Sequence, residues 1–400
     1  MRPPSFRTRT RWCMTAAMTP ITTTADLAAF VDRLQGTEFV TVDTEFMREK
    51  TYWPQLCLIQ VAGPDEAAII DPQADGIDLA PLFALMRDTS VLKVFHAARQ
   101  DVEIFVHLTG EVPAPLFDTQ VAAMVCGFGD SVGYETLVSR LTNGRIDKSS
   151  RFTDWSHRPL TERQLVYALS DVTHLRPVYE KLRNKLRKTG REHWLAEEMA
   201  ILTDPATYRL APEDAWKRIK VRAEKPRFLA VLREVCAWRE REAQKKDIPR
   251  SRVVRDESLI EIAAHAPTSV EELARTRGLG DSLARGRYGT EILAAVQAAL
   301  AIPEKDLPRP EARQDQPGGI APTVELLRVL LRMVSEEEEV AARLIATSAD
   351  LELLAASDTA DIPAMHGWRR EVFGEPALKL KNGKLALAME RKRVKLVELP

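Results

Sequence analysis

The sequence of 400 residues has few cysteines and no long apolar run. Its four cysteines, Cys13, Cys57, Cys126 and Cys236, are widely spaced and form no C-x-x-C pair. This usage argues against a disulfide framework and a zinc knuckle, and it fits a reducing cytoplasm. Apolar runs such as Ala67–Ile70 are far shorter than the ~20 residues that cross a bilayer, so we expect no transmembrane helix and no membrane partner.

The sequence also lacks a G-x-x-x-x-G-K-[ST] loop, an H-E-x-x-H helix and a G-x-S-x-G turn. No nucleotide-binding, zinc-protease or serine-hydrolase motif therefore competes with the acidic residues described below. Hydrophobic residues make up 45% of the chain and charged residues 29%, which excludes collagen, a disulfide mini-protein and a wholly disordered chain. The length suggests two to four domains of ~100–200 residues each.

The net charge of -1 hides an uneven distribution. Residues 181–255 carry 21 Lys and Arg against 11 Asp and Glu, whereas the segments on either side are acidic. A basic middle between acidic flanks is typical of a protein with a polyanionic partner. The alternative is a solvated helix surface.

The first twenty residues contain several arginines and no acid. They superficially match an organelle transit peptide, but we interpret them as an upstream-extended start, with Met14 or Met18 as the true one. Residues 1–20 are therefore left out of the expected fold as a disordered or mis-assigned extension.

Four β-rich runs predict a sheet at the start of the next segment. Residues 39–46, 55–63 and 67–72 follow at short spacing and predict an antiparallel meander, and residues 91–97 predict a fourth strand. Helical patterns follow near Asp101 and from Asp118, so we expect a mixed α/β domain over residues 21–205. Thr161 and Gln164 fit a capping box, which predicts that a helix begins there.

The rest of the chain is predicted to be mainly helical. Residues 215–302 predict a small helical bundle, and the Pro- and Gly-rich residues 303–322 predict a linker. Residues 323–400 are interpreted as a degraded second copy of the bundle.

Asp43 and Glu45 are two apart on the first predicted strand, so both carboxylates lie on the same sheet face. Adjacent carboxylates raise each other's pKa unless a positive charge neutralises them. A hard divalent cation such as Mg²⁺ does this. The alternative is a pair of carboxylates that face solvent on a half-exposed strand.

Two further acidic signals follow in the chain. Tyr167 and Asp171 are four apart on the helix that starts at Thr161, so they share one helix face; the alternative is a Tyr–Asp pair on a surface helix. Asp101 stands at a predicted strand-to-helix junction, where it could instead be an ordinary first-turn acid. Together the four carboxylates can hold two Mg²⁺ ions ~3.5–4 Å apart, an arrangement that cleaves phosphodiesters, while a tyrosine hydroxyl orients the water.

These motifs resemble those of ribonuclease D, in the DEDD superfamily of 3′-to-5′ exonucleases. Asp43-Thr44-Glu45-Phe46 is similar to the first exonuclease motif of the family, and residues 96–103, which include Asp101, are similar to the second. Residues 167–171 match the third motif in its tyrosine version. The resemblance covers residues 22–205 closely, extends to 225–302 as an HRDC module, and is weaker over 323–400.

The resemblance implies a ribonuclease H-like mixed-sheet exonuclease domain followed by one or two all-α HRDC domains. It implies a hydrolytic 3′-to-5′ exoribonuclease that trims precursor tRNA and other RNAs and releases nucleoside 5′-monophosphates. The metal ligands would be Asp43, Glu45, Asp101 and Asp171, with two Mg²⁺ ions or Mn²⁺ in their place. Tyr167 would complete the catalytic set by orienting the attacking water.

Four other residues are candidate substrate contacts. Phe46 and Gln60 are placed to touch the terminal nucleotide, and Lys148 to meet a phosphate. Trp155 is a candidate for stacking on a base, with core packing as the alternative. We expect the basic segment to bind RNA phosphates, because such contacts are independent of base sequence.

Three other functions remain open from the sequence. The motifs do not distinguish RNA from DNA, so a repair-type DNA exonuclease is one alternative. An inactive RNA-binding protein is another, although every expected carboxylate is present. A helicase-associated module is the third. We expect a cytoplasmic monomer, since no heptad pattern indicates a coiled coil.

Overall fold

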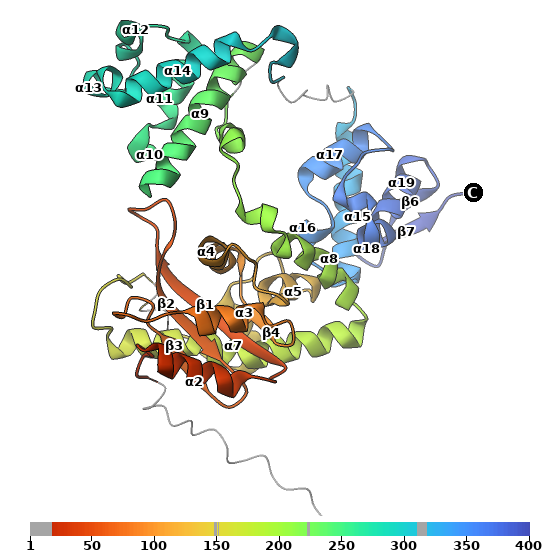
Figure 1. Cartoon of the computed structure of the whole chain (residues 1–400). Coiled ribbons are helices and arrows are strands. Elements are labelled where there is room, and N and C mark those ends of the chain that lie inside the picture. The colour runs from red at the N-terminus through yellow and green to blue at the C-terminus, as the bar shows by residue number, and fades with distance from the viewer. Residues whose placement is uncertain (1–17, 148–149, 151, 222–224, 310–317) are drawn as a thin grey trace, which may run out of the picture. The chain divides into compact units, whose positions relative to one another are not determined.

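The computed structural model describes all residues except 1–17, 148–149, 151, 222–224 and 310–317. The chain divides into two compact units (Figure 1). Unit 1 comprises residues 1–45, 57–204 and 316–400, and unit 2 comprises residues 46–56 and 205–315. Most of the proposed N-terminal extension, including Met14, and Lys148 lie outside the described residues.

A five-stranded mixed sheet with the order β3-β2-β1-β4-β5 forms the centre of unit 1. The strand β1 pairs in parallel with β4, and β4 with β5, whereas β2 and β3 are antiparallel. The four predicted strands are confirmed, but β5 was not predicted. The strands are β1 (Phe39–Met47), β2 (Gln55–Ala62), β3 (Ala67–Ile70), β4 (Leu92–Phe95) and β5 (Leu116–Asp118).

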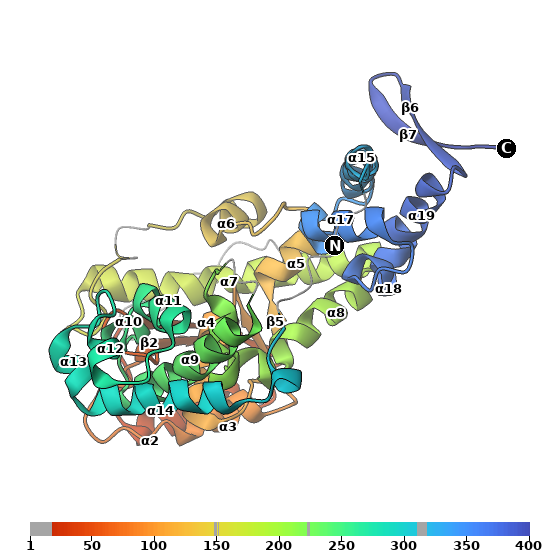
Figure 2. The same ribbon diagram turned by 90° about the horizontal axis from the view of Figure 1, so that it is seen from above.

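Helices pack on both faces of this sheet, with α7 along one face and α2 and α3 on the other (Figure 2). The mixed α/β class is therefore confirmed. The helices of this part are α2 (Thr24–Leu34), α3 (Ala80–Arg87), α4 (Arg99–Thr109), α5 (Thr119–Val125), α6 (Tyr134–Thr142), α7 (Glu162–Thr189) and α8 (Glu192–Thr203).

The start of α7 is fixed by the predicted capping box. The Thr161 hydroxyl accepts a hydrogen bond from the Gln164 backbone N–H, and the Gln164 side chain accepts one from the Thr161 N–H at 3.0 Å. The helix ends at Gly190, whose φ of 68° is a conformation that glycine adopts without strain. This long helix carries Tyr167 and Asp171 across the sheet.

The last part of the chain belongs to unit 1, where its helices share a hydrophobic core with the part built around the five-stranded sheet. Leu327 and Trp368 are buried in the same cluster as Leu182 and Trp194. The elements are α15 (Ala321–Glu337), α16 (Ala342–Ile345), α17 (Ser348–Ala356), α18 (Gly367–Arg369), α19 (Glu375–Lys381), β6 (Leu385–Glu390) and β7 (Arg393–Glu398).

The expectation of an all-helical module over residues 323–400 is wrong for its last part. Residues 385–398 form an antiparallel hairpin, because apolar and polar side chains alternate along β7 with the period of a strand. The predicted division of the chain into domains remains a prediction. Of the predicted linker, only residues 303–309 and 318–322 are described.

Unit 2 is a helical bundle around α9, as the sequence predicts. The segment 46–56 packs on it: the Tyr52 hydroxyl donates to the buried Glu240 carboxylate, and Arg250 contacts both groups. The helices are α9 (Pro226–Lys246), α10 (Arg250–Val253), α11 (Asp256–His265), α12 (Val270–Ala274), α13 (Asp281–Arg285) and α14 (Arg287–Ala301).

No helix in the part of the chain that the structure describes combines the length and apolar composition needed to cross a membrane.

Candidate active site

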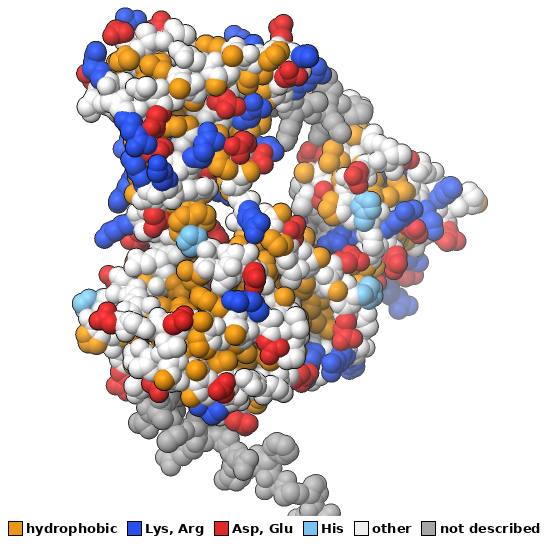
Figure 3. Space-filling model, viewed as in Figure 1, with side chains coloured by type: hydrophobic (Ala, Val, Ile, Leu, Met, Phe, Trp, Pro, Cys, Tyr) orange, Lys and Arg blue, Asp and Glu red, His pale blue; other side chains and the backbone are white. Residues whose placement is uncertain are grey.

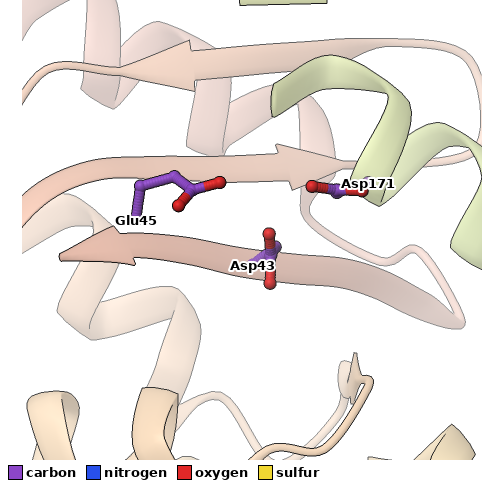
Figure 4. Close-up of side chains that lie close together, drawn as sticks. All are labelled: Asp43, Glu45 and Asp171. Atoms are coloured by element: carbon purple, nitrogen blue, oxygen red, sulfur yellow. The ribbon is translucent and has the colours of Figure 1, made fainter. Parts of the chain in front are cut away.

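Three of the predicted carboxylates converge in unit 1. One oxygen each of Asp43, Glu45 and Asp171 lies within 4.8 Å of the others. Figure 4 shows Glu45 and Asp171 pointing toward each other, with Asp43 beside them. Asp43 and Glu45 come from β1 and Asp171 comes from α7, so the site depends on the packing of this helix against this strand.

Two hydrogen bonds hold α7 against its neighbours at this point. The hydroxyl of the buried Thr41, two residues before Asp43 on β1, donates to the Val172 carbonyl at 2.8 Å. The Tyr134 hydroxyl, from α6, donates to the Asp171 backbone carbonyl. Both bonds reach the turn of α7 that carries Asp171, so they fix its carboxylate opposite β1.

The charge of this cluster is unfavourable without a cation. Burial raises the pKa of Asp43 well above its usual range, and the neighbouring Asp171 carboxylate raises it further. Such groups become fully ionised when a positive charge is placed among them. Carboxylate oxygens at this spacing are the ligands that Mg²⁺ and Mn²⁺ prefer. The residues present therefore fit a divalent metal ion.

Asp101 lies beside this trio, in the first turn of α4, and is buried. The Thr44 hydroxyl donates to its carboxylate at 2.5 Å. Burial raises the pKa of Asp101 well above its usual range, and the charge of Asp43 adds to this. The structure thus couples Asp101 to Asp43, although it is not part of the tight group of three.

The β4–α4 junction that positions Asp101 is held by Asp118. Its carboxylate accepts hydrogen bonds from the Ala97 and Ala98 backbone N–H groups at 3.0 and 2.8 Å, and it also caps α5. Ala97 has a φ of 58°, which is unusual for a residue with a side chain. The two carboxylate contacts keep the backbone in this conformation.

Tyr167 lies one helical turn before Asp171 on α7. Burial raises the pKa of its hydroxyl far above the usual value, and the charge of Asp171 raises it further. The hydroxyl is also hydrogen-bonded to the Asp171 side chain. The hydroxyl therefore stays protonated at neutral pH. The centroids of the Trp155 and Tyr167 rings lie 6.0 Å apart, so the indole packs beside the tyrosine ring.

The proposed substrate contacts have different surroundings. Phe46 is partly exposed near the end of β1. Gln60 is fully buried, and its amide oxygen and nitrogen have no hydrogen-bond partner among the described residues. Trp155 is 2% exposed and packs beside Tyr167, which favours the core-packing interpretation over base stacking. Lys148 lies outside the described residues.

Sequence reasoning missed several residues that build the site. Thr41 and Tyr134 make hydrogen bonds described above, but no motif distinguishes them from other strand and helix residues. Thr44 stands in the first motif, but no role was predicted for its hydroxyl. His96 was noted only as part of a motif. Its Nδ1 lies 3.0 Å from the Thr119 hydroxyl, and burial lowers the pKa of the imidazole to about 4.

Two family models match the chain. One, described as 3′-5′ exonuclease, covers residues 18–187 and includes every carboxylate of the site. The other, described as HRDC domain, covers residues 228–296 in unit 2. Each matched segment lies mainly within one of the two compact units.

The chain is also similar to proteins over nearly its full length. It is 56% identical to ribonuclease D of Nitrobacter hamburgensis, over 94% of this chain and 99% of the relative. It is 54% identical to ribonuclease D of Gluconacetobacter diazotrophicus, over 94% and 96%. The crystal structure of Escherichia coli RNase D, described as an exoribonuclease involved in structured RNA processing, aligns with a TM-score of 0.78 and 35% identity, over 91% of this chain and 98% of that one.

Proposed function

Because the chain belongs to the ribonuclease D family and is therefore a 3′-to-5′ exoribonuclease, we propose that it trims the 3′ ends of precursor tRNA and other structured RNAs with two Mg²⁺ ions. The observation that carries the proposal is the convergence of Asp43, Glu45 and Asp171 from β1 and α7. A metal-dependent nuclease needs such a group of carboxylates at the scissile phosphate.

In the proposed site, Asp43, Glu45 and Asp171 would hold one metal ion, and Asp43 and Asp101 would hold the second. When bound, the ions lower the pKa of a water molecule and neutralise the charge that develops on the phosphate. The protein's own part is to hold its carboxylates ionised and fixed. The bond from Thr41 to the Val172 carbonyl fixes the turn of α7 that carries Asp171, and the bond from Thr44 to the Asp101 carboxylate fixes that side chain and favours its ionised form.

Tyr167 is the proposed water-orienting residue. Since burial keeps its hydroxyl protonated, it acts as a hydrogen-bonding group and not as a base. Attack of the water on the last phosphodiester breaks the bond to the 3′ oxygen of the preceding nucleotide. The products are a nucleoside 5′-monophosphate and an RNA shortened by one residue.

Unit 2 is proposed to bind the RNA body. It contains the HRDC domain and most of the basic segment 181–255. Phosphate contacts by Lys and Arg provide affinity that is independent of base sequence and sensitive to salt. The proposed setting is the cytoplasm, with the protein as a monomer; none of the described cysteines forms a disulfide, which suits a reducing compartment.

The proposal is tested with a tRNA that carries a few extra 3′ nucleotides and a matched single-stranded DNA. Each is incubated with the protein in Mg²⁺, in Mn²⁺ and in EDTA, and the released products are separated by chromatography. We expect stepwise shortening of the RNA, release of 5′-monophosphates, and no reaction in EDTA. Asp171→Asn, tested in parallel, should bind the RNA and leave its length unchanged.

Three outcomes would contradict the proposal, the third measured with an unstructured RNA added to the test. Shortening of DNA alone would assign the site to a repair-type exonuclease. Binding of the RNA without shortening in either metal would mean that the carboxylates no longer support catalysis. Trimming of an unstructured RNA but not of the extended tRNA would leave the chemistry in place and overturn the proposed substrate.

A further inference from the structure

The chain closes with a two-stranded hairpin whose tip is made of two basic residues. The register pairs Glu390 with Arg393, so Arg391 and Lys392 alone form the turn between β6 and β7. Figure 2 shows the hairpin extending beyond α19 and away from the other helices of unit 1. Figure 3 shows Lys and Arg side chains on the part of the molecule where Figure 1 labels these strands.

The backbone at this tip is strained for the residues that occupy it. Arg391 has a φ of 48° and Lys392 a φ of 73°, so both are in the left-handed region. A two-residue hairpin turn of this kind favours Asn-Gly, which adopts these angles at least cost. Here the turn is instead occupied by two residues with long side chains, Arg391 and Lys392. Strain of this type is retained where the side chains serve a function that the relaxed residues cannot.

The side chains at the tip are available to a partner. Arg391, Lys392 and Arg393 are exposed, and within the described chain no hydrogen bond or ion pair holds their side chains. Lys395, by contrast, lies 3.0 Å from the Glu390 carboxylate. The hairpin therefore presents three cations together at its end.

An apolar face of the hairpin explains how the tip is kept in place. Leu387 and Leu396 are paired across the strands and share a face, and Val394 lies on the same face. All three pack against the hydrophobic core of unit 1. One face is thus anchored, which gives the tip a fixed direction.

The kind of partner follows from what the hairpin contains. Its cations suit phosphate groups, and a polyanion is the substrate of this enzyme. Proteins that hold single-stranded nucleic acid combine such charge with aromatic side chains on which bases stack. The segment 379–400 contains no Phe, Tyr or Trp. Double-helical RNA is held mainly through its shape, its phosphates and its 2′-hydroxyl groups.

We infer that Arg391 and Lys392 bind the phosphate backbone of the base-paired body of a structured RNA whose 3′ end is being trimmed. The inference rests on the proposed function, since it assigns a second contact to the same substrate. It makes the hairpin a determinant of substrate class: the tip increases affinity for RNA with a duplex and contributes little for a short single strand.

The test replaces the tip with the relaxed turn, Arg391→Asn with Lys392→Gly. The KM for an RNA with a duplex body and a single-stranded 3′ tail should rise by about 10- to 30-fold at 0.15 M salt, as expected for two lost phosphate contacts. The slope of log affinity against log salt should become less steep by about 1.8. The kcat, and the KM for a short single-stranded RNA, should change less than twofold.

Thermal unfolding separates a binding role from a structural one. The Asn-Gly variant should be at least as stable as the natural protein, because the new residues relieve the strained turn. Arg391→Gln with Lys392→Gln removes the charge but keeps the strain, so it should lose the same affinity without the gain in stability.

A charge-matched control removes two other exposed cations, by Arg33→Gln with Arg87→Gln. These side chains form ion pairs with Glu66 and Glu111 in unit 1. The control should leave the KM for the duplex RNA near the natural value. Equal losses in the control and the tip variants would overturn the inference, because only net charge would then matter.

Direct binding of the duplex RNA, measured without catalysis, keeps this test separate from the proposed function. If the natural protein fails to trim even the short RNA, the proposed function is wrong. If trimming occurs and the tip variants bind the duplex RNA as tightly as the natural protein, the inference about the hairpin is wrong. If the tip variants keep the natural affinity for the duplex RNA but lose binding to an acidic protein, the tip would be assigned to a protein partner. This result would also overturn the inference.

Discussion

Trp194 and Trp368 stack with their ring centroids 4.1 Å apart and their planes within 10° of parallel. Trp194 belongs to α8, directly after α7, and Trp368 belongs to α18. The neighbouring Arg369 forms an ion pair with the buried Glu198. The last part of the chain is therefore packed into the core of the exonuclease unit, at a sequence distance that no local pattern bridges.

The first prediction concerns this stack. Trp368→Ala should lower the free energy of unfolding by about 3–5 kcal/mol, because it leaves a cavity against Trp194. Denaturant unfolding followed by circular dichroism measures the change. Met389→Ala, at a side chain that is 70% exposed, serves as the control and should have almost no effect. A small effect of Trp368→Ala would mean that residues 316–400 contribute little to unit 1.

The second prediction concerns Tyr167. Tyr167→Phe should reduce kcat by about 10²- to 10³-fold, as is usual when one preorganised hydrogen-bonding group at the reacting centre is lost. It should leave the stabilisation by Mg²⁺ unchanged, because the carboxylates of Asp43, Glu45 and Asp171 remain. Single-turnover trimming and thermal unfolding measure the two effects. Tyr288→Phe removes a tyrosine hydroxyl that belongs to unit 2 and accepts a hydrogen bond from Lys246, and it should keep the natural kcat. A Tyr167→Phe enzyme with near-natural rates would remove the role assigned to the hydroxyl.

Much of the fold was predictable because its signals are local. Four strands follow from β-rich runs, and the start of α7 follows from the capping box at Thr161, which the structure confirms. The strand β5 was missed because Leu116–Asp118 is only three residues long, too short for a periodic pattern. The hairpin at the C-terminus was left out because residues 323–400 were interpreted as a second copy of the helical bundle.

The carboxylates of the candidate site were predictable from the sequence, but the hydrogen bonds and packing that hold them in place were not. Asp43, Glu45 and Asp171 carry recognisable spacing, and the structure brings them together. Thr41 contributes through a hydrogen bond to Val172, which is 131 positions away. Such a contact depends on tertiary packing, so a single sequence contains no signal for it. The surroundings of Trp155 likewise became clear only from its burial beside Tyr167.

The third prediction is a dependence of stability on pH that comes from His96. Burial lowers the pKa of the folded imidazole to about 4, whereas its ordinary value is 6.5. Between these pH values the unfolded chain binds a proton that the folded chain does not, so stability falls as the pH falls. The full contribution is about 3 kcal/mol.

Unfolding measured at pH 6.5 and at pH 4.5 tests this contribution. His96→Asn should show a smaller loss of stability on acidification than the natural protein. The exposed His157 provides the control, and His157→Asn should retain the natural slope. An unchanged slope in His96→Asn would mean that other groups account for the acid sensitivity.

The fourth prediction concerns the carboxylate trio. Without metal, Asp171→Asn should be as stable as the natural protein or more so, because it removes a charge that repels Asp43. Mg²⁺ should stabilise the natural protein by about 2.7 kcal/mol at a hundredfold excess over its Kd, and the variant by much less. Trimming should fall below detection in the variant. Asp130→Asn removes an exposed carboxylate and should respond to Mg²⁺ as the natural protein does.

The pH dependence of this metal effect follows from the same carboxylates. Burial and the Asp171 charge raise the pKa of Asp43, so protons compete with the metal at low pH. The apparent Kd for Mg²⁺ should therefore decrease as the pH rises, with protons released on binding. Calorimetry in buffers of different ionisation enthalpy measures this release directly. If the natural protein bound Mg²⁺ with the same affinity at pH 5 and pH 8, or if Asp171→Asn kept the full stabilisation, the trio would not be the metal site.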